Sequence, residues 1–151
     1  MNEVRGGVML QPGPMFAIAI LLVNDHWAKA AYPGWITGKL SDVAGLAFFP
    51  LLLVALAELA GAPATRRGLA VSCLATAAVF AAAKLWPPAN DAVRLAFGLA
   101  QWPVRGLAAL TRAQPVPAPA AVQMRLDPSD LLALPAVLLS VWWGRRLPPG
   151  R

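Results

Sequence analysis

The sequence predicts an all-α integral membrane protein: a four-helix bundle with an amphipathic helix in the membrane interface between the third and fourth spans. Three observations lead to this fold class. Of the 151 residues, 58% are hydrophobic and only 13% are charged, too few charges to coat a soluble domain. Four apolar stretches are long enough to cross a bilayer. Polar residues gather between these stretches, and the length fits one transmembrane domain, residues 1–151.

The first two predicted spans cover about residues 8–30 and 42–62. Pro12 and Pro14 weaken the start of the first, and a cleavable signal peptide is an alternative interpretation of that segment. Against it, the region before the apolar stretch holds only one basic residue, Arg5. Ser41 is the expected N-cap of the second span.

The third and fourth predicted spans cover residues 68–86 and 129–143. Pro87 and Pro88 close the third. Small residues share one face of it and would let another helix approach closely. These are Ala75, Ala78 and Ala82.

Residues 92–112 are apolar but carry a polar stripe of Arg94, Gln101, Arg105 and Arg112, spaced seven, four and seven residues apart. Burying two arginines and Pro103 in the bilayer centre would cost at least ~5 kcal/mol, so we expect an interfacial helix kinked or divided at Pro103. The proline-rich connector 113–124 shows no sign of a packed element.

Four spans alternate in direction, so most of the unusual polar residues are expected at one membrane face. The paired arginines at 66–67 and 145–146 would mark the opposite, cytoplasmic face. The polar cluster is then extracytoplasmic, in a multi-pass protein of the bacterial inner membrane.

The two halves of the chain also resemble each other, since each reads helix, Asn-Asp, loop, Ser-Asp, helix. Such a repeat would form two parallel helical hairpins and bring Asp42 and Asp130 towards each other. Chance recurrence of these dipeptides is the alternative.

The clustered residues are candidates for binding a phosphate group, directly through cations or through a divalent metal. The candidate ligand-binding residues are Asp25, His26, Lys39, Asp42, Lys84, Asp91, Arg125 and Asp130. The metal candidates are His26, Asp42 and Asp130, although no cofactor is required by the sequence. Helix capping is the alternative role for Asp42 and Asp130, and pairing with Asp25 is the alternative role for Lys29.

The charge and cysteine content limit the kinds of molecule that the protein is expected to bind. The net charge of +6 comes from basic residues that occur singly or in pairs beside apolar runs, which favours membrane lipids over nucleic acid. Cys73 is the only cysteine, which excludes an internal disulfide and multi-cysteine metal motifs.

The stretch YPGWITGKLSDVAGLAFFPLLL resembles a class of small, uncharacterised bacterial membrane proteins with a PGWxTGKLSDxAGL segment, and more distantly VanZ-like proteins. Lys39, and Arg125 with Asp130, stand where charged positions of the VanZ-like pattern would fall, whereas Asp42 and Val43 replace its His-Phe pair. The resemblance implies a role at the cell envelope.

The sequence therefore favours a small polytopic protein whose one-sided polar cluster binds a phosphate-bearing envelope lipid or another anionic ligand. One alternative is an accessory or scaffold subunit with a membrane-protein partner or a second copy of itself. Another is a membrane-embedded, metal-dependent hydrolase or transferase using Asp25, His26, Asp42 and Asp130. Whether the protein is an enzyme stays open.

Overall fold

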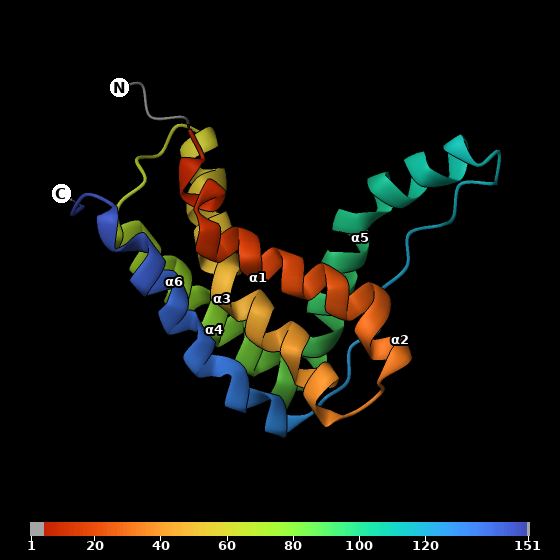
Figure 1. Cartoon of the computed structure of the whole chain (residues 1–151). Coiled ribbons are helices and arrows are strands. Elements are labelled where there is room, and N and C mark those ends of the chain that lie inside the picture. Colours follow the sequence, from red (N-terminus) through yellow and green to blue (C-terminus); the bar gives the residue numbers. More distant parts are fainter. Residues whose placement is uncertain (1–4, 151) are drawn as a thin grey trace. The chain divides into compact units, whose positions relative to one another are not determined.

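A computed structural model describes residues 5–150, and the regular elements in that range are all helical (Figure 1). The predicted all-α class is therefore confirmed for the described residues, while residues 1–4 and 151 of the predicted domain lie outside them. The chain divides into two compact units. The first consists of Met1–Ala78 and Asp130–Arg151, and the second of Val79–Ser129.

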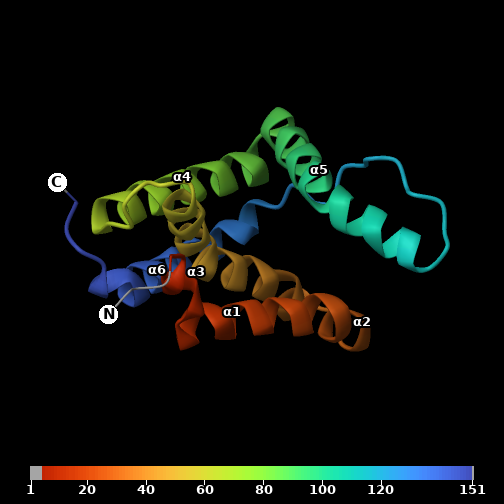
Figure 2. The same cartoon turned by 90° about the horizontal axis from the view of Figure 1, so that it is seen from above.

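The first unit is built around α3 (Trp35–Leu59), which packs against α1 (Pro12–Val23) and α6 (Val137–Trp143), as Figures 1 and 2 show. The shorter elements are η1 (Gly7–Leu10), a π-helical turn η2 (Asn24–Ala28), α2 (Lys29–Ala31) and η4 (Gly144–Arg146). Leu51 of α3 is completely buried, and the buried Ser140 hydroxyl of α6 donates a hydrogen bond of 2.6 Å to the Ala47 carbonyl. The core therefore lies along α3.

The first predicted span, 8–30, is not one regular helix. Its α-helix begins at Pro12, where a missing N–H is tolerated, and ends at Val23. The π-helical turn and α2 then extend the helical path to Ala31.

The second predicted span starts seven residues earlier than expected, at Trp35, and Ser41 is not its N-cap. The Gly34 N–H donates to the Thr37 hydroxyl (3.1 Å), which itself donates to the Tyr32 carbonyl (2.9 Å). These bonds fix the turn after Pro33 and start the helix there. Ser41 and Asp42 consequently lie inside α3, so the capping role considered for Asp42 is wrong.

The third predicted span is confirmed as a helix, α4 (Arg66–Leu85), which continues from the first unit into the second. Thr65 caps its start, because its hydroxyl accepts a 3.0 Å hydrogen bond from the Gly68 N–H. The positive φ of 98° at Gly61, a conformation that favours glycine, ends the preceding helix.

The fourth predicted span has two helical types. Pro128–Ala136 forms a 3-10 helix, η3, and only Val137–Trp143 is α-helical. Pro135 lacks the N–H that an α-helix would bond to the carbonyl four residues earlier. The Ser-Asp pairs at 41–42 and 129–130 therefore differ in position, the first lying inside an α-helix and the second in the first turn of η3.

The second unit contains the end of α4 and α5 (Pro87–Thr111). This helix starts five residues before the predicted segment 92–112, runs through Pro103 and changes direction along its length (Figures 1 and 2). Ala113, with a φ of 52°, ends it.

The connector 113–124 has no regular structure beyond the turn that ends α5 and is mostly exposed, but hydrogen bonds tie it to that helix. Arg94 Nε donates to the Val122 carbonyl (2.9 Å), and Trp102 Nε1 donates to the Pro117 carbonyl (2.7 Å). A Cβ at Gly98 would lie 2.0 Å from the Ala120 carbonyl oxygen, so this close approach requires glycine.

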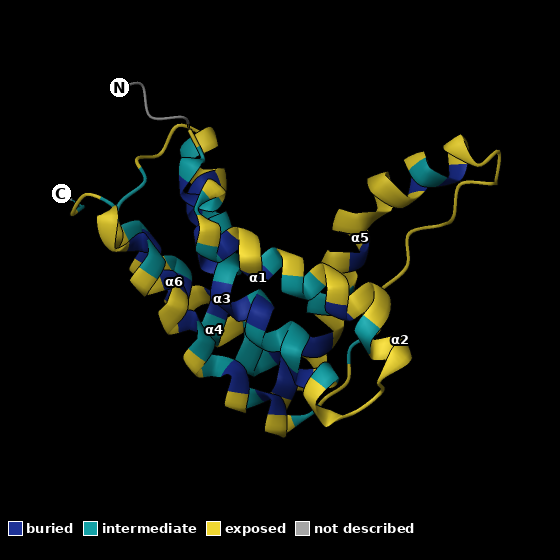
Figure 3. Ribbon diagram, viewed as in Figure 1, coloured by how far each residue is buried: buried dark blue, intermediate teal, exposed yellow. Residues whose placement is uncertain are grey.

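Two helices among the described residues, α3 and α4, are long and apolar enough to cross a membrane. Exposed residues occur on every helix in Figure 3, and many of them are large and hydrophobic. Phe16 of α1, Leu74 of α4 and Leu138 of α6 are 67%, 73% and 67% exposed. Within the 18-residue windows that qualify α3 and α4, only 39% and 28% is buried inside the protein.

Candidate functional site

A hydrogen-bond network joins the end of α1 to the first turns of α3. The Asn24 side-chain nitrogen donates to the Thr37 carbonyl and to the Ser41 hydroxyl, both at 2.7 Å. Ser41 donates to Asp25 at 2.5 Å, and Asp25 pairs with Lys29 at 2.7 Å. We call these five residues the Asn24 network. The expected proximity of the end of span one and the start of span two is confirmed here.

Asn24 is 1% exposed, whereas the side chains of Asp25 and Lys29 are each 41% exposed. The network therefore runs from the interior to the surface. Lys29 and Ser41 both donate hydrogen bonds to the Asp25 carboxylate. Lys29 is thus the i,i+4 partner of Asp25, as its alternative role supposed.

A buried ion pair joins α3 to η3. Lys39 Nζ lies 2.6 Å from Asp130 Oδ1, and the two side chains are 10% and 12% exposed. The ammonium also lies 5.3 Å from the centre of the Trp35 ring, within range of a cation–π contact. Ionisable groups in such surroundings are expected to have a partner, and Lys39 and Asp130 are partners of each other.

A pocket of about 220 Å³ opens beside this ion pair. Its walls are apolar apart from Lys39 and consist of side chains from α3 and η3. The lining residues are Trp35, Ile36, Lys39, Leu40, Val43, Leu132 and Ala133. We call it the Lys39 pocket. It combines a buried cation with an apolar surface, the arrangement that suits a ligand with an anionic head and an apolar body.

The structure places Asp42 and His26 in different surroundings. Asp42 lies in α3, is partly buried and is not among the residues that line the Lys39 pocket. His26 is exposed, and its Nδ1 lies 3.0 Å from the Leu22 carbonyl of its own helical segment. No group of three or more His, Cys, Asp or Glu side chains is placed to hold a metal ion within residues 5–150.

The remaining candidates, Lys84, Asp91 and Arg125, belong to the second unit. Lys84 is buried with its ammonium 5.2 Å from the Phe80 ring centre, and Asp91 pairs with Arg94 at 3.1 Å. Arg125 is exposed. Among the eight predicted ligand-binding residues, Lys39 and Asp130 form a direct ion pair.

Sequence reasoning missed the contributions of Thr37 and of the Trp35 ring. Thr37 stands three residues after a Pro-Gly turn, a spacing that could have signalled the start of a helix.

No protein family, no curated protein and no solved structure matches this chain.

Proposed function

We propose that the protein is a multi-pass protein of the bacterial inner membrane, in which the Lys39 pocket binds a phosphate-bearing envelope lipid. The membrane location is supported by the exposed apolar surfaces of α1, α4 and α6, which no part of the described chain covers. Lipid is the solvent that makes such surfaces favourable.

In this arrangement the four spans are α1 with its neighbouring turns, α3, α4, and η3 with α6. The last contains nine residues of 3-10 helix and seven of α-helix. At about 2.0 and 1.5 Å per residue these rise roughly 28 Å, close to the hydrocarbon thickness. Amphipathic α5 then lies in the interface, with Arg105 bonded to Gln101 (2.9 Å) on its polar stripe.

The two ends of the first unit differ in character. One carries the Asn24 network and the Lys39–Asp130 pair, beside the exposed indoles of Trp27 and Trp35. Such rings favour the head-group region. The other end carries two arginine pairs, at 66–67 and 145–146. By the positive-inside rule the arginine end is cytoplasmic and the Lys39 end extracytoplasmic.

The Lys39 pocket carries the functional proposal. Lys39 supplies the cation of this pocket, and its ammonium donates a 2.6 Å hydrogen bond to Asp130. A lipid phosphate entering the pocket would bind the same ammonium, while the apolar wall around Val43 and Leu132 receives the adjoining glycerol and acyl carbons. Asp130 positions the Lys39 ammonium. It also selects against weakly charged ligands, because a ligand must compete with the Asp130 carboxylate for the same ammonium.

The test is a lipid titration of purified full-length protein, followed by native mass spectrometry. The variant is Lys39→Met with Asp130→Leu, which removes both charges and leaves neither buried alone. We expect the dissociation constant for phosphatidylglycerol to rise about tenfold, the loss of one charge-assisted hydrogen bond. The matched control, Lys29→Met with Asp25→Asn, removes an exposed pair and should leave binding unchanged. Equal binding by the Lys39 variant and wild type would reject the proposal.

A second candidate function, that of an accessory subunit, is favoured by α4. Ala75 and Ala78 are exposed on this helix, and the adjacent Leu74 is 73% exposed. A face of small residues fits close packing with a partner helix. A stoichiometric protein retained in mild detergent, and lost on Ala78→Phe, would support this function. The envelope role implied by the resemblance to VanZ-like proteins is compatible with either candidate.

A further inference from the structure

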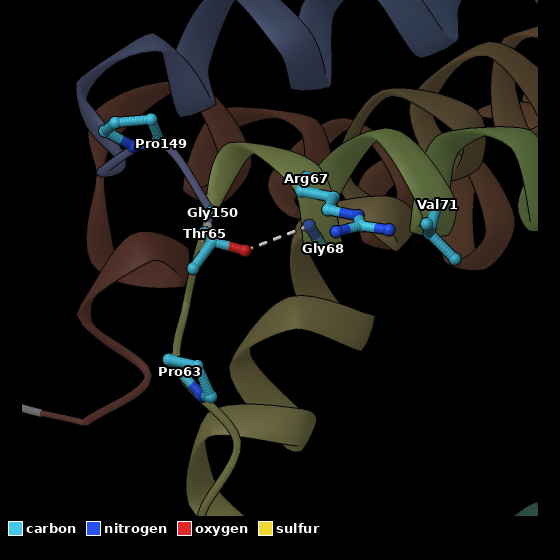
Figure 4. Close-up of a pocket in the computed structure, with 7 residues that line it drawn as sticks. All are labelled: Pro63, Thr65, Arg67, Gly68, Val71, Pro149 and Gly150. Atoms are coloured by element: carbon cyan, nitrogen blue, oxygen red, sulfur yellow. Dashed lines mark hydrogen bonds between the residues drawn. The ribbon is translucent and has the colours of Figure 1, made fainter.

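A second pocket, of about 690 Å³, lies at the arginine end of the first unit (Figure 4). It is formed by the turn before α4, the first two turns of α4 and the C-terminal segment. Its lining residues are Pro63, Thr65, Arg67, Gly68, Val71, Pro149 and Gly150. We call it the Arg67 pocket, and it takes no part in the function proposed above.

Specific hydrogen bonds hold the C-terminal segment in place against α4. The Arg66 N–H donates to the Pro148 carbonyl at 2.9 Å. The Arg66 guanidinium donates to the carbonyls of Leu147 (2.8 Å) and Arg145. Arg66 therefore binds three carbonyls of the C-terminal segment, and this segment forms one side of the pocket.

Gly150 allows the wall to close. A Cβ at this position would lie 2.8 Å from Arg67 Cβ and 3.3 Å from Thr65 Oγ1. Any larger residue would push the segment away from α4. The depth of the pocket thus depends on a glycine at this point.

Arg67 gives the pocket its chemistry. Figure 4 shows its exposed side chain running along α4 towards Val71, which lies one turn further along the same face. Pro63, Val71 and Pro149 form apolar walls. Arg67 is the cationic side chain of the lining, and the forked donors of a guanidinium match a phosphate.

The charge at this end is strongly positive. The described residues near the start of α4 include four arginines, at 66, 67, 145 and 146, with Glu58 as the neighbouring acid. Glu58 already accepts a 2.8 Å hydrogen bond from the Gly6 N–H. Charge complementarity therefore favours an anionic occupant.

We infer that the Arg67 pocket binds the head group of an anionic membrane phospholipid, with its phosphate on Arg67. Val71 is 61% exposed near the start of a candidate span, so acyl chains leaving the pocket can continue along the apolar surface of α4. The volume lies within the usual range of about 300–1,000 Å³ for ligand sites. The inference rests on the proposed membrane location, but not on the Lys39 pocket.

The experiment uses the full chain carrying Lys39→Met and Asp130→Leu, so that the other proposed lipid site is disabled. Phosphatidylglycerol is titrated into the detergent-solubilised protein, and bound lipids are counted by native mass spectrometry. Arg67→Gln should raise the dissociation constant about tenfold, as for loss of one charge-assisted hydrogen bond. Arg146→Gln, which removes an exposed charge at the same end but outside the pocket, should change it less than about twofold.

Equal weakening by Arg67→Gln and Arg146→Gln would overturn the inference, because it would show diffuse attraction to a basic surface. Competition by inorganic phosphate at the lipid's own concentration would also overturn it, since the apolar walls would then contribute nothing. Arg67→Lys keeps the charge but not the fork, and a loss smaller than that of Arg67→Gln is expected. Because Arg67 is exposed, these variants should fold, and unchanged circular dichroism spectra would verify it.

Discussion

Asp130→Asn is expected to destabilise the protein strongly, because it leaves the Lys39 ammonium buried without its counter-ion. The two side chains are 10% and 12% exposed, and the charged atoms lie 2.6 Å apart. At an effective dielectric constant of about 20, unit charges at this distance attract by roughly 6 kcal/mol. Bringing each ion out of water costs several kcal/mol, so the pair contributes little net stability, but removal of one partner costs about 3–5 kcal/mol.

The free energy of unfolding is measured by titrating the protein from mild detergent into SDS and following its helical circular dichroism. Asp130→Asn should lower it by at least about 3 kcal/mol. The double variant Lys39→Met with Asp130→Leu, which buries no charge, should lie within about 1 kcal/mol of the wild type.

The control is Asp25→Asn, because Asp25 and Lys29 form an equally short pair at 2.7 Å whose side chains are 41% exposed. Its loss should cost less than about 1 kcal/mol. If Asp130→Asn cost no more than Asp25→Asn, the reasoning from burial would be refuted. Failure of the double variant to recover stability would show that packing at these positions, and not charge, dominates.

Two further outcomes are expected. Gly13→Ala should lower the free energy of unfolding by about 1–3 kcal/mol, since a Cβ there would lie 2.3 Å from the Trp143 ring; a loss below about 0.5 kcal/mol would show that α1 and α6 separate easily. Ala113→Gly should raise the melting temperature and stabilise by about 0.5–1 kcal/mol, because its φ of 52° strains any residue with a Cβ.

Local signals account for what was predicted correctly about the helices. Pro87 and Pro88 end α4 at Leu85, and Thr65 with the following arginines starts it within two residues of the predicted span. These residues act through their own backbone, by removing an N–H or supplying a cap. Such helix starts and ends can therefore be predicted from the residue types in the sequence alone.

The start of α3 shows where a local signal misled. Ser41 has the side chain of an N-cap, but Thr37 fixes the turn after Pro33 and starts the helix two turns earlier. Ser41 then bonds to Asn24 and Asp25 across the helix pair. The same hydroxyl serves either role, and only the packing of α1 on α3 decides between them.

The sequence by itself determined that this chain is helical and too apolar to be coated by its own charges, and it predicted that the end of the first span lies close to the start of the second. Only the tertiary structure decided which charges meet. Lys39 pairs with Asp130 across 91 positions, and the C-terminal segment closes a pocket over Arg67. Helix ends follow from local backbone chemistry, whereas partners so distant in the chain depend on the rotation and register of packed helices, which hydropathy leaves free.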